Sequence, residues 1–167
     1  MGYLRRQAVI GLPVYVKEPF SFVGRVEDLL LNRKGERVVA LLLDGGGLLA
    51  RRFLPREEVL AFGPDAILVR KRVAMKTGGK KLEPLLEPAR KLLGRRALDE
   101  GGRDLGTVDD IFFHPRTGRV AGYALSRGIL ADLLAGPFFL PREASLALGK
   151  EDILLVRRMK EVSPEET

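Results

Sequence analysis

The sequence repeats itself once along its 167 residues, and this repeat constrains the fold more than any other feature. The stretch Gly24–Asp28 (Gly-Arg-Val-Glu-Asp) recurs as Gly106–Asp110 (Gly-Thr-Val-Asp-Asp), 82 positions later. Three further pairs of blocks follow in the same order: an apolar run, a Phe-Leu-Pro-Arg-Glu element and a closing Leu-Val-Arg run, at 37–44 and 119–126, 53–57 and 139–143, and 65–70 and 152–157. This order predicts one small structural unit written twice.

Within each copy, short apolar or alternating runs are separated by Gly, Pro and Asn, which is typical of strands joined by hairpins. Gly35 and Gly118 provide the positive φ that such turns need. Gly24 and Gly106 precede the first strong strand, where we expect the sheet to turn a corner. After Pro55, residues 56–59 are expected to form one helical turn. We therefore predict an all-β fold of two tandem small β-barrels, each with one short helical turn.

The predicted organisation is a first repeat over residues 1–76, a linker over 77–90, a second repeat over 91–160 and a disordered tail over 161–167. Residues 76–81 are polar and glycine-rich, and Pro84 and Pro88 interrupt any helix that follows. One copy is too small for its core to supply much stability. We therefore expect the copies to pack on each other or to form a dimer interface.

Composition excludes several classes of chemistry. The chain has no cysteine and one histidine, which rules out disulfides and thiolate catalysis and leaves little for a metal site. We therefore predict no catalytic residues, no metal and no cofactor. No apolar run is long enough to span a bilayer and no signal peptide is evident, so we expect a cytoplasmic protein. Dense charge with only two side-chain amides, Gln7 and Asn32, suggests a thermophile.

The repeated Gly-x-Val-x-Asp stretch, the glycine turn with its apolar strand, and the Leu-Pro-x-Glu element together resemble the PRC-barrel family. This small β-barrel is shared by the cytoplasmic domain of photosynthetic reaction-centre H subunits and the C-terminal domain of the ribosome maturation factor RimM. The resemblance implies an adaptor, because the first barrel caps a membrane complex and the second contributes to binding at the small ribosomal subunit. This chain lacks the membrane helix of the first and the N-terminal domain of the second, so those specific roles are not transferred.

Asp28 and Asp110 are acids at equivalent places in both copies. Paired carboxylates can perform acid–base work or hold a cation. Their retention in both copies, together with Gly24 and Gly106, favours a structural role in which each carboxylate accepts backbone N–H bonds. His114 replaces Asn32 in the matching turn and is interpreted as a surface turn residue. The glycines at 45–47 lack the context of a phosphate-binding loop and are interpreted as a hairpin loop.

Basic residues concentrate around the joint between the copies, in a chain with 29 Lys and Arg against 22 Asp and Glu. We name as candidate polyanion-binding residues Arg70, Lys71, Arg72, Lys76, Lys80, Lys81, Arg95 and Arg96, with Arg90 and Lys91 beside them. No aromatic residue lies between Phe62 and Phe112, so this cluster predicts phosphate attraction without base stacking.

The copies differ most at residues 128–138, where the second carries an apolar insertion and the first has only Leu48 and Leu49. Exposed apolar patches mark contact surfaces. The insertion is expected to be buried against the sister copy or a second subunit, or else to dock a partner. The candidate partner-binding residues are Ile129, Leu130, Leu133, Leu134 and Phe138.

These observations favour a non-catalytic adaptor that binds a protein partner or forms a homo-oligomer, without a small-molecule substrate. The first alternative is a ribosome- or RNA-associated factor that uses the basic joint, with a RimM-like role in RNA processing or ribosome assembly. The second is an enzyme whose carboxylate site draws on both copies. A cleft in which acids from both copies converge is required by that second alternative.

Overall fold

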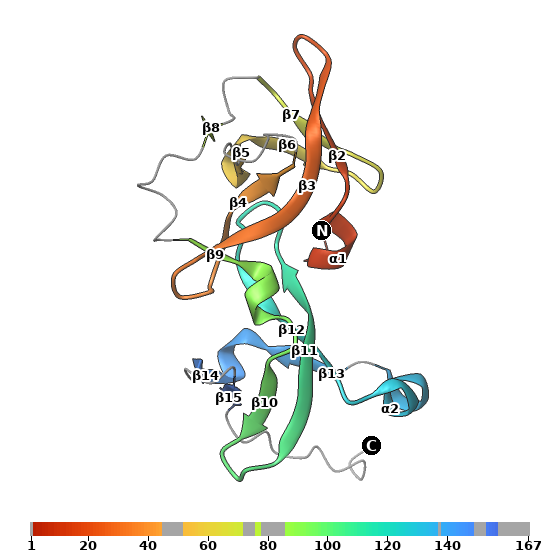
Figure 1. Ribbon diagram of the computed structural model, residues 1–167, viewed down its shortest axis with the longest axis vertical. Helices are drawn as coiled ribbons and strands as arrows, with labels where there is room; N and C mark the ends of the chain where they lie inside the picture. The colour runs from red at the N-terminus through yellow and green to blue at the C-terminus, as the bar shows by residue number, and fades with distance from the viewer. Residues whose placement is uncertain are drawn as a thin grey trace.

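A computed structural model describes residues 2–44, 52–71, 76–77, 86–136, 138–148 and 153–156 of the chain (Figure 1). The first half contains β1 (Leu4–Arg5), α1 (Arg6–Val9), β2 (Pro13–Val16), β3 (Ser21–Asn32), β4 (Val38–Leu43), β5 (Arg52–Pro55), η1 (Arg56–Glu58), β6 (Val59–Phe62), β7 (Ile67–Val69) and β8 (Lys76–Thr77). The second half contains β9 (Leu86–Pro88), η4 (Ala89–Leu92), β10 (Arg96–Asp99), β11 (Asp104–Phe113), β12 (Val120–Ser126), α2 (Ile129–Ala135), β13 (Phe138–Pro141), η5 (Arg142–Ala144), β14 (Ser145–Leu148) and β15 (Ile153–Val156).

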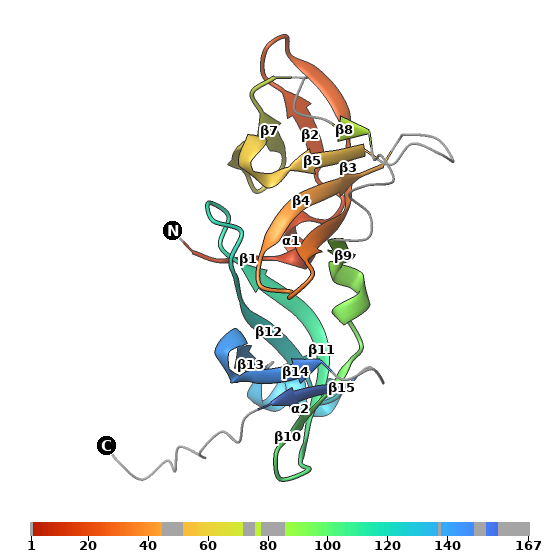
Figure 2. The same ribbon diagram turned by 90° about the vertical axis from the view of Figure 1, so that its left-hand side faces the viewer.

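The described strands form two sheets, one per repeat, which lie one above the other along the long axis (Figures 1 and 2). The first has the order β6-β7-β2-β3-β4-β5-β8. The second has the order β14-β15-β10-β11-β12-β13, which matches the first six strands of the first sheet. In each, one parallel pair joins a strand near the start of the repeat to a strand near its end, β2 with β7 and β10 with β15. The all-β tandem fold is confirmed, although neither sheet closes on itself within the described residues.

One long strand organises each repeat. The N-terminal half of β3 pairs with β2, and its C-terminal half pairs with β4. Between Val26 and Asp28 the register against β4 shifts, and β11 shifts at the equivalent place between Val108 and Asp110. Such a bulge reverses which residues face inward. Val26 and Leu29, three positions apart, therefore both reach the main core.

The segment that precedes each repeat packs on the other repeat. β1 pairs with β11 of the second repeat, with Leu4 opposite Phe113. β9 pairs with β3 of the first repeat, with Glu87 opposite Leu31. Residues 86–90, which lie within the linker predicted over 77–90, form β9 and the start of η4.

A second reciprocal contact lies between the two hairpins. Arg37 and Arg119, which are equivalent residues, face each other in an isolated antiparallel bridge. The N–H of Val38 donates to the carbonyl of Gly118 at 2.7 Å, and the N–H of Val120 donates to that of Glu36 at 2.9 Å. Each bond recurs with the repeats exchanged, which is the pattern of a two-fold symmetric interface.

One hydrophobic core runs through both repeats. Val14, Leu41 and Leu54 of the first belong to the same buried cluster as Ile111 and Leu125 of the second. Phe62 and Phe113 meet edge to face across the boundary, with ring centroids 5.9 Å apart. The expected packing of the copies on each other is confirmed. Helical turns η1 and η5 follow the two Leu-Pro elements, as predicted.

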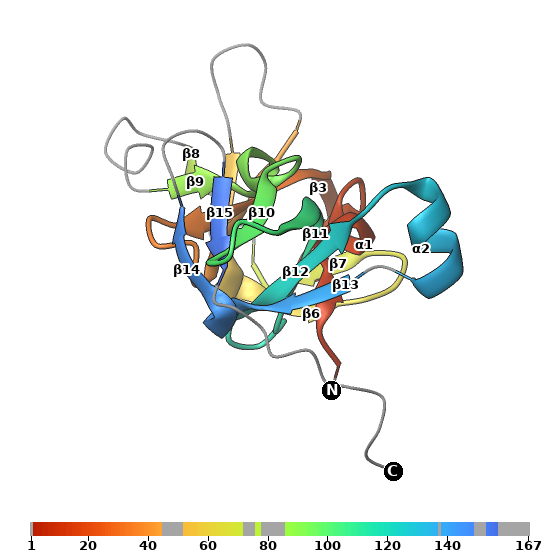
Figure 3. The same ribbon diagram turned by 90° about the horizontal axis from the view of Figure 1, so that it is seen from below.

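Among the described residues, three helical elements were not predicted: α1, η4 and α2. The first two lie in the two segments that precede each repeat and pack on the other, β1–α1 and β9–η4, which we call the exchanged segments. Helix α2 projects from the side of the second repeat (Figures 1 and 3). Among the described residues, no helix has the length and apolar character needed to cross a membrane.

Candidate interaction surfaces

Asp28 is buried and holds the two exchanged segments in place. Its Oδ1 accepts hydrogen bonds from Nε of Arg6 at 2.9 Å and from the N–H of Leu29 at 2.8 Å. Its Oδ2 accepts the N–H of Arg90 at 3.2 Å, and the Arg90 guanidinium lies 3.8 Å away. The carboxylate therefore stabilises the start of η4 while it is paired with α1.

Asp110 occupies the equivalent place and is also buried. Its Oδ1 accepts the N–H of Ile111 at 2.8 Å and the N–H of Gln7 at 3.2 Å. Its Oδ2 is buried and has no hydrogen-bond partner among the described residues. Two neighbouring residues of α1 thus contact one aspartate each, Arg6 contacting Asp28 and Gln7 contacting Asp110. The structure places this acid pair in the contact between the repeats, where their oxygens meet backbone N–H groups.

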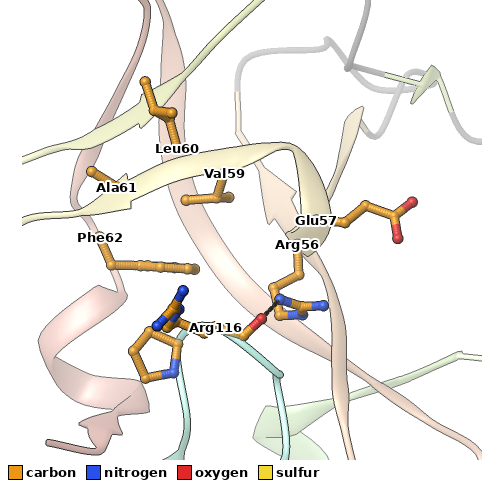
Figure 4. Close-up of a pocket in the computed structure, with 8 residues that line it drawn as sticks. Arg56, Glu57, Val59, Leu60, Ala61, Phe62 and Arg116 are labelled. Carbon is orange, nitrogen blue, oxygen red and sulfur yellow. Dashed lines mark hydrogen bonds between the residues drawn. The ribbon is translucent and has the colours of Figure 1, made fainter. Parts of the chain in front are cut away.

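A cleft of about 520 Å³ lies between η1–β6 of the first repeat and the 114–118 turn of the second (Figure 4). Arg56 donates a hydrogen bond to the carbonyl of Arg116 across it. Glu57 is the one carboxylate in its lining, so acids from the two repeats do not converge here. This cleft does not provide the site that the enzyme alternative requires.

His114 lies at the start of its turn. Its Nδ1 accepts the N–H groups of Arg116 at 3.2 Å and Thr117 at 3.4 Å, and its ring meets Tyr3 edge-on at 6.0 Å. Because Nδ1 accepts these bonds, the imidazole closes the turn in the way that the Asn32 side chain does for Glu36 and Arg37.

The predicted basic joint is not one patch among the described residues. Arg70 and Lys71 follow β7 at the far end of the first repeat, whereas Arg95 and Arg96 lead into β10 of the second (Figure 1). Arg96 pairs with Asp104 at 2.6 Å, and this bond, with the Gly106 N–H, lowers the pKa of Asp104. Lys76 lies in β8, and Arg72, Lys80 and Lys81 lie outside the described residues.

The neighbours of that joint are also engaged within the molecule. Lys91 pairs with Glu87 at 3.0 Å, and Nε of Arg95 donates to the carbonyl of Lys91 at 2.9 Å.

The apolar insertion forms helix α2 and its flanks. Leu133 and Leu134 are 77% and 89% exposed, so the burial against the sister copy that was considered above does not occur at these two positions. Phe138 is half-buried under the Arg127 guanidinium, which lies 5.1 Å from its ring centre. A hollow of about 340 Å³ separates α2 from β13. Ile129 and Leu130 begin the helix, but their side chains lie outside the description.

Hydrogen bonds tie α2 to the end of β12. Oγ of Ser126 donates to Oδ2 of Asp132 at 2.5 Å, and the Arg127 N–H donates to Oδ1 at 3.1 Å. These two bonds hold the pKa of Asp132 below its ordinary value. The helix is therefore anchored at one carboxylate while Leu133 and Leu134 face solvent.

An aromatic surface on the β2–β3 hairpin was not predicted from the sequence. Tyr15 of β2 stacks on Phe20 with centroids 5.3 Å apart, and Phe22 of β3 meets Tyr15 edge-on at 5.7 Å. Phe20 and Phe22 are 73% and 54% exposed. Strand alternation supplies a signal that was present in the sequence: Val14 and Val16 point inward, so Tyr15 points outward.

Comparison with known proteins gives the family. The model of the PRC-barrel domain matches residues 1–76 and again residues 86–163. The chain is also 26% identical over 152 residues to the uncharacterized protein YrrD of Bacillus subtilis (strain 168), an alignment that covers 88% of this chain and 84% of YrrD. The two PRC-barrel matches correspond to the two repeats and together cover most of the sequence. The chain therefore belongs to the PRC-barrel family, with two PRC-barrel domains in tandem.

Proposed function

We propose that this protein is a non-catalytic protein-interaction module whose contact surface is helix α2 with its flank at Phe138. The observation that carries the proposal is the exposure of Leu133 and Leu134 on a helix that projects from the second repeat. The sequence of the first repeat has no counterpart of this helix, so the PRC-barrel fold does not require it.

The energetics favour a contact role. Complete burial of one leucine side chain contributes about 1.5–3 kcal/mol relative to leaving it in water. Two adjacent leucines on one short helix therefore offer enough apolar surface to anchor a partner, and the hollow beneath α2 gives the partner's side chains a place to enter. The occupant is a second copy of the chain or a different protein.

The test is the double substitution Leu133→Asp/Leu134→Asp. Both side chains are exposed, so we expect the thermal unfolding midpoint to change little. Sedimentation velocity over a range of protein concentrations measures self-association, and affinity capture with a tagged chain followed by reconstitution from purified components measures a heterologous partner. The matched control is Leu60→Asp, at a leucine of the first repeat that is 43% exposed.

We expect the double variant to lose association that both the native chain and the Leu60→Asp variant retain. Retention of both self-association and partner binding by a folded double variant would show that α2 is not the contact surface.

The ribosome- or RNA-associated alternative is the weaker candidate, because the basic residues of the joint do not form one patch among the described residues (Figure 1). It requires an RNA affinity that falls steeply with salt concentration, since phosphate contacts release counterions. An affinity that does not change between low and high salt would exclude it.

A further inference from the structure

The first repeat carries an aromatic surface at the far end of the long axis, distinct from α2. Tyr15 lies opposite Phe22 in the β2–β3 pair, and Phe20 lies in the turn between these strands. Figures 1 and 2 show this hairpin as the end of the molecule that lies farthest from the second repeat. Tyr15, Phe20 and Phe22 thus form one apolar cluster, in which Phe20 and Phe22 are exposed and Tyr15 is half-buried. Half-buried Leu68 of β7 lies opposite Tyr15 and extends the cluster.

Four exposed cations surround this cluster. The Lys17 N–H donates to the carbonyl of Val69 at 2.8 Å, which places Arg70 and Lys71 beside the hairpin turn. Arg25 lies on the same pair of strands, with its guanidinium 6.0 Å from the centre of the Phe22 ring. Glu18 is the one acid of the turn itself.

The equivalent surface of the second repeat has a different chemistry. The counterpart of the Tyr15–Phe22 pair is Leu98 opposite Asp104, and Asp104 is engaged by Arg96. The turn there carries Gly101 and Gly102 instead of an aromatic residue. Because the second repeat forms the same strands without this cluster, the fold does not explain three aromatic rings at the tip of the first.

We propose that the β2–β3 hairpin binds the surface of a bilayer that contains anionic phospholipid. Aromatic side chains are favoured at the boundary between headgroups and acyl chains, and cations beside them are attracted to anionic headgroups. Phe20 enters this boundary, and Lys17, Arg70 and Lys71 face the lipid phosphates. The hairpin lies on the membrane and does not cross it.

The ring geometry favours lipid over single-stranded nucleic acid. Proteins that stack bases present aromatic faces that are free to receive them. Here Tyr15 and Phe20 are nearly parallel, at an interplanar angle of 5°, and cover one face of each other, while Phe22 meets Tyr15 edge-on. The rings join into a continuous apolar surface, which suits acyl chains better than separated bases.

The test is flotation of the full chain with vesicles of phosphatidylcholine, with and without phosphatidylglycerol. We expect binding only to the anionic vesicles. Phe20→Ser/Phe22→Ser should lower the partition coefficient at least about tenfold, because each lost phenylalanine removes apolar area from the bilayer. Lys17→Gln/Arg70→Gln/Lys71→Gln should lower it by a similar factor or more. Leu133→Ser/Leu134→Ser is the matched control, since it removes exposed apolar side chains elsewhere and should bind normally.

A second readout does not depend on loss of binding. The chain has no tryptophan, so Phe20→Trp introduces a single indole at the tip. Its emission should shift to the blue on addition of anionic vesicles and stay unchanged with neutral ones. The proposal is overturned if the native chain ignores anionic vesicles, if the phenylalanine variant binds them normally, or if Phe20 is needed only for binding a single-stranded RNA oligonucleotide. The α2 variants separate this outcome from failure of the proposed function.

Discussion

Asp28 and Asp110 occupy the same place in two copies of one fold, yet their surroundings differ. Each accepts the N–H of the following residue and one N–H from the segment that precedes the other repeat. Among the described residues, Asp28 but not Asp110 also pairs with guanidinium groups, those of Arg6 and Arg90, and the counterpart of Arg6 is Ala89. The shared bonds hold the repeats together, and the unshared ion pair makes one end of the interface more strongly held than the other.

The same division extends to the surface. The bonds between the hairpins and those made by the exchanged segments recur when the repeats are interchanged, whereas α2 and the aromatic hairpin each occur once among the described residues. Shared features therefore account for architecture, and each repeat keeps its own exposed surface. The predictions that follow test this comparison in order of decreasing effect.

The largest difference is expected between Asp28→Asn and Asp110→Asn. Loss of the Asp28 charge leaves the mostly buried Arg6 guanidinium without its counter-ion, which costs about 3 kcal/mol or more. Asp110 has no cationic partner among the described residues, and its amide can still accept the two N–H bonds, so we expect a loss of about 1 kcal/mol or less. Urea unfolding measures both values. Equal losses would mean that the ion pair adds nothing to the interface.

A smaller difference is expected between Gly106→Ala and Gly24→Ala. Both glycines have positive φ, at 114° and 147°, so alanine is strained at either position. A Cβ at Gly106 would overlap the backbone carbonyl oxygen of Ser126, whereas at Gly24 its closest neighbour, at 2.8 Å, is the guanidinium of Arg52, a side chain that can move. We expect Gly106→Ala to cost about 1 kcal/mol more than Gly24→Ala in the same unfolding experiment. A larger loss for Gly24→Ala would show that Gly106 is not the glycine in closer contact with neighbouring backbone.

Much of the fold was predictable because its determinants are local. The repeated blocks, the glycine turns and the helical turn after Pro55 depend on neighbouring residues. The exchange of segments was not predictable from pattern, since the bond between Gln7 and Asp110 joins residues 103 positions apart. Prolines near β9 suggested a linker, although a segment without strong periodicity can still be held by bonds to a distant strand.

The candidate sites divide in the same way. Apolar composition identified the α2 surface, because an insertion rich in leucine stands out against the other copy. It did not predict that Leu133 and Leu134 face solvent, which depends on how the helix leaves the sheet. The aromatic cluster was overlooked because Tyr15, Phe20 and Phe22 are also typical of core residues. Only the burial of the residues next to Tyr15 and Phe22 in their strands shows that these two side chains face outward.

The smallest expected effect is a pH dependence at the base of α2. The bonds from Ser126 and from the Arg127 N–H lower the pKa of Asp132 in the folded state relative to the unfolded chain. Their stabilisation is therefore complete above the ordinary carboxyl pKa of about 3.9 and is lost as pH falls through the lower, folded value. The amide resonance of Arg127 should titrate with a midpoint below about 3.9 in NMR spectra, and Asp132→Asn should abolish that titration. Because α2 has no counterpart in the described part of the first repeat, a midpoint at or above the ordinary value would show that Asp132 does not anchor the helix by which the two repeats differ.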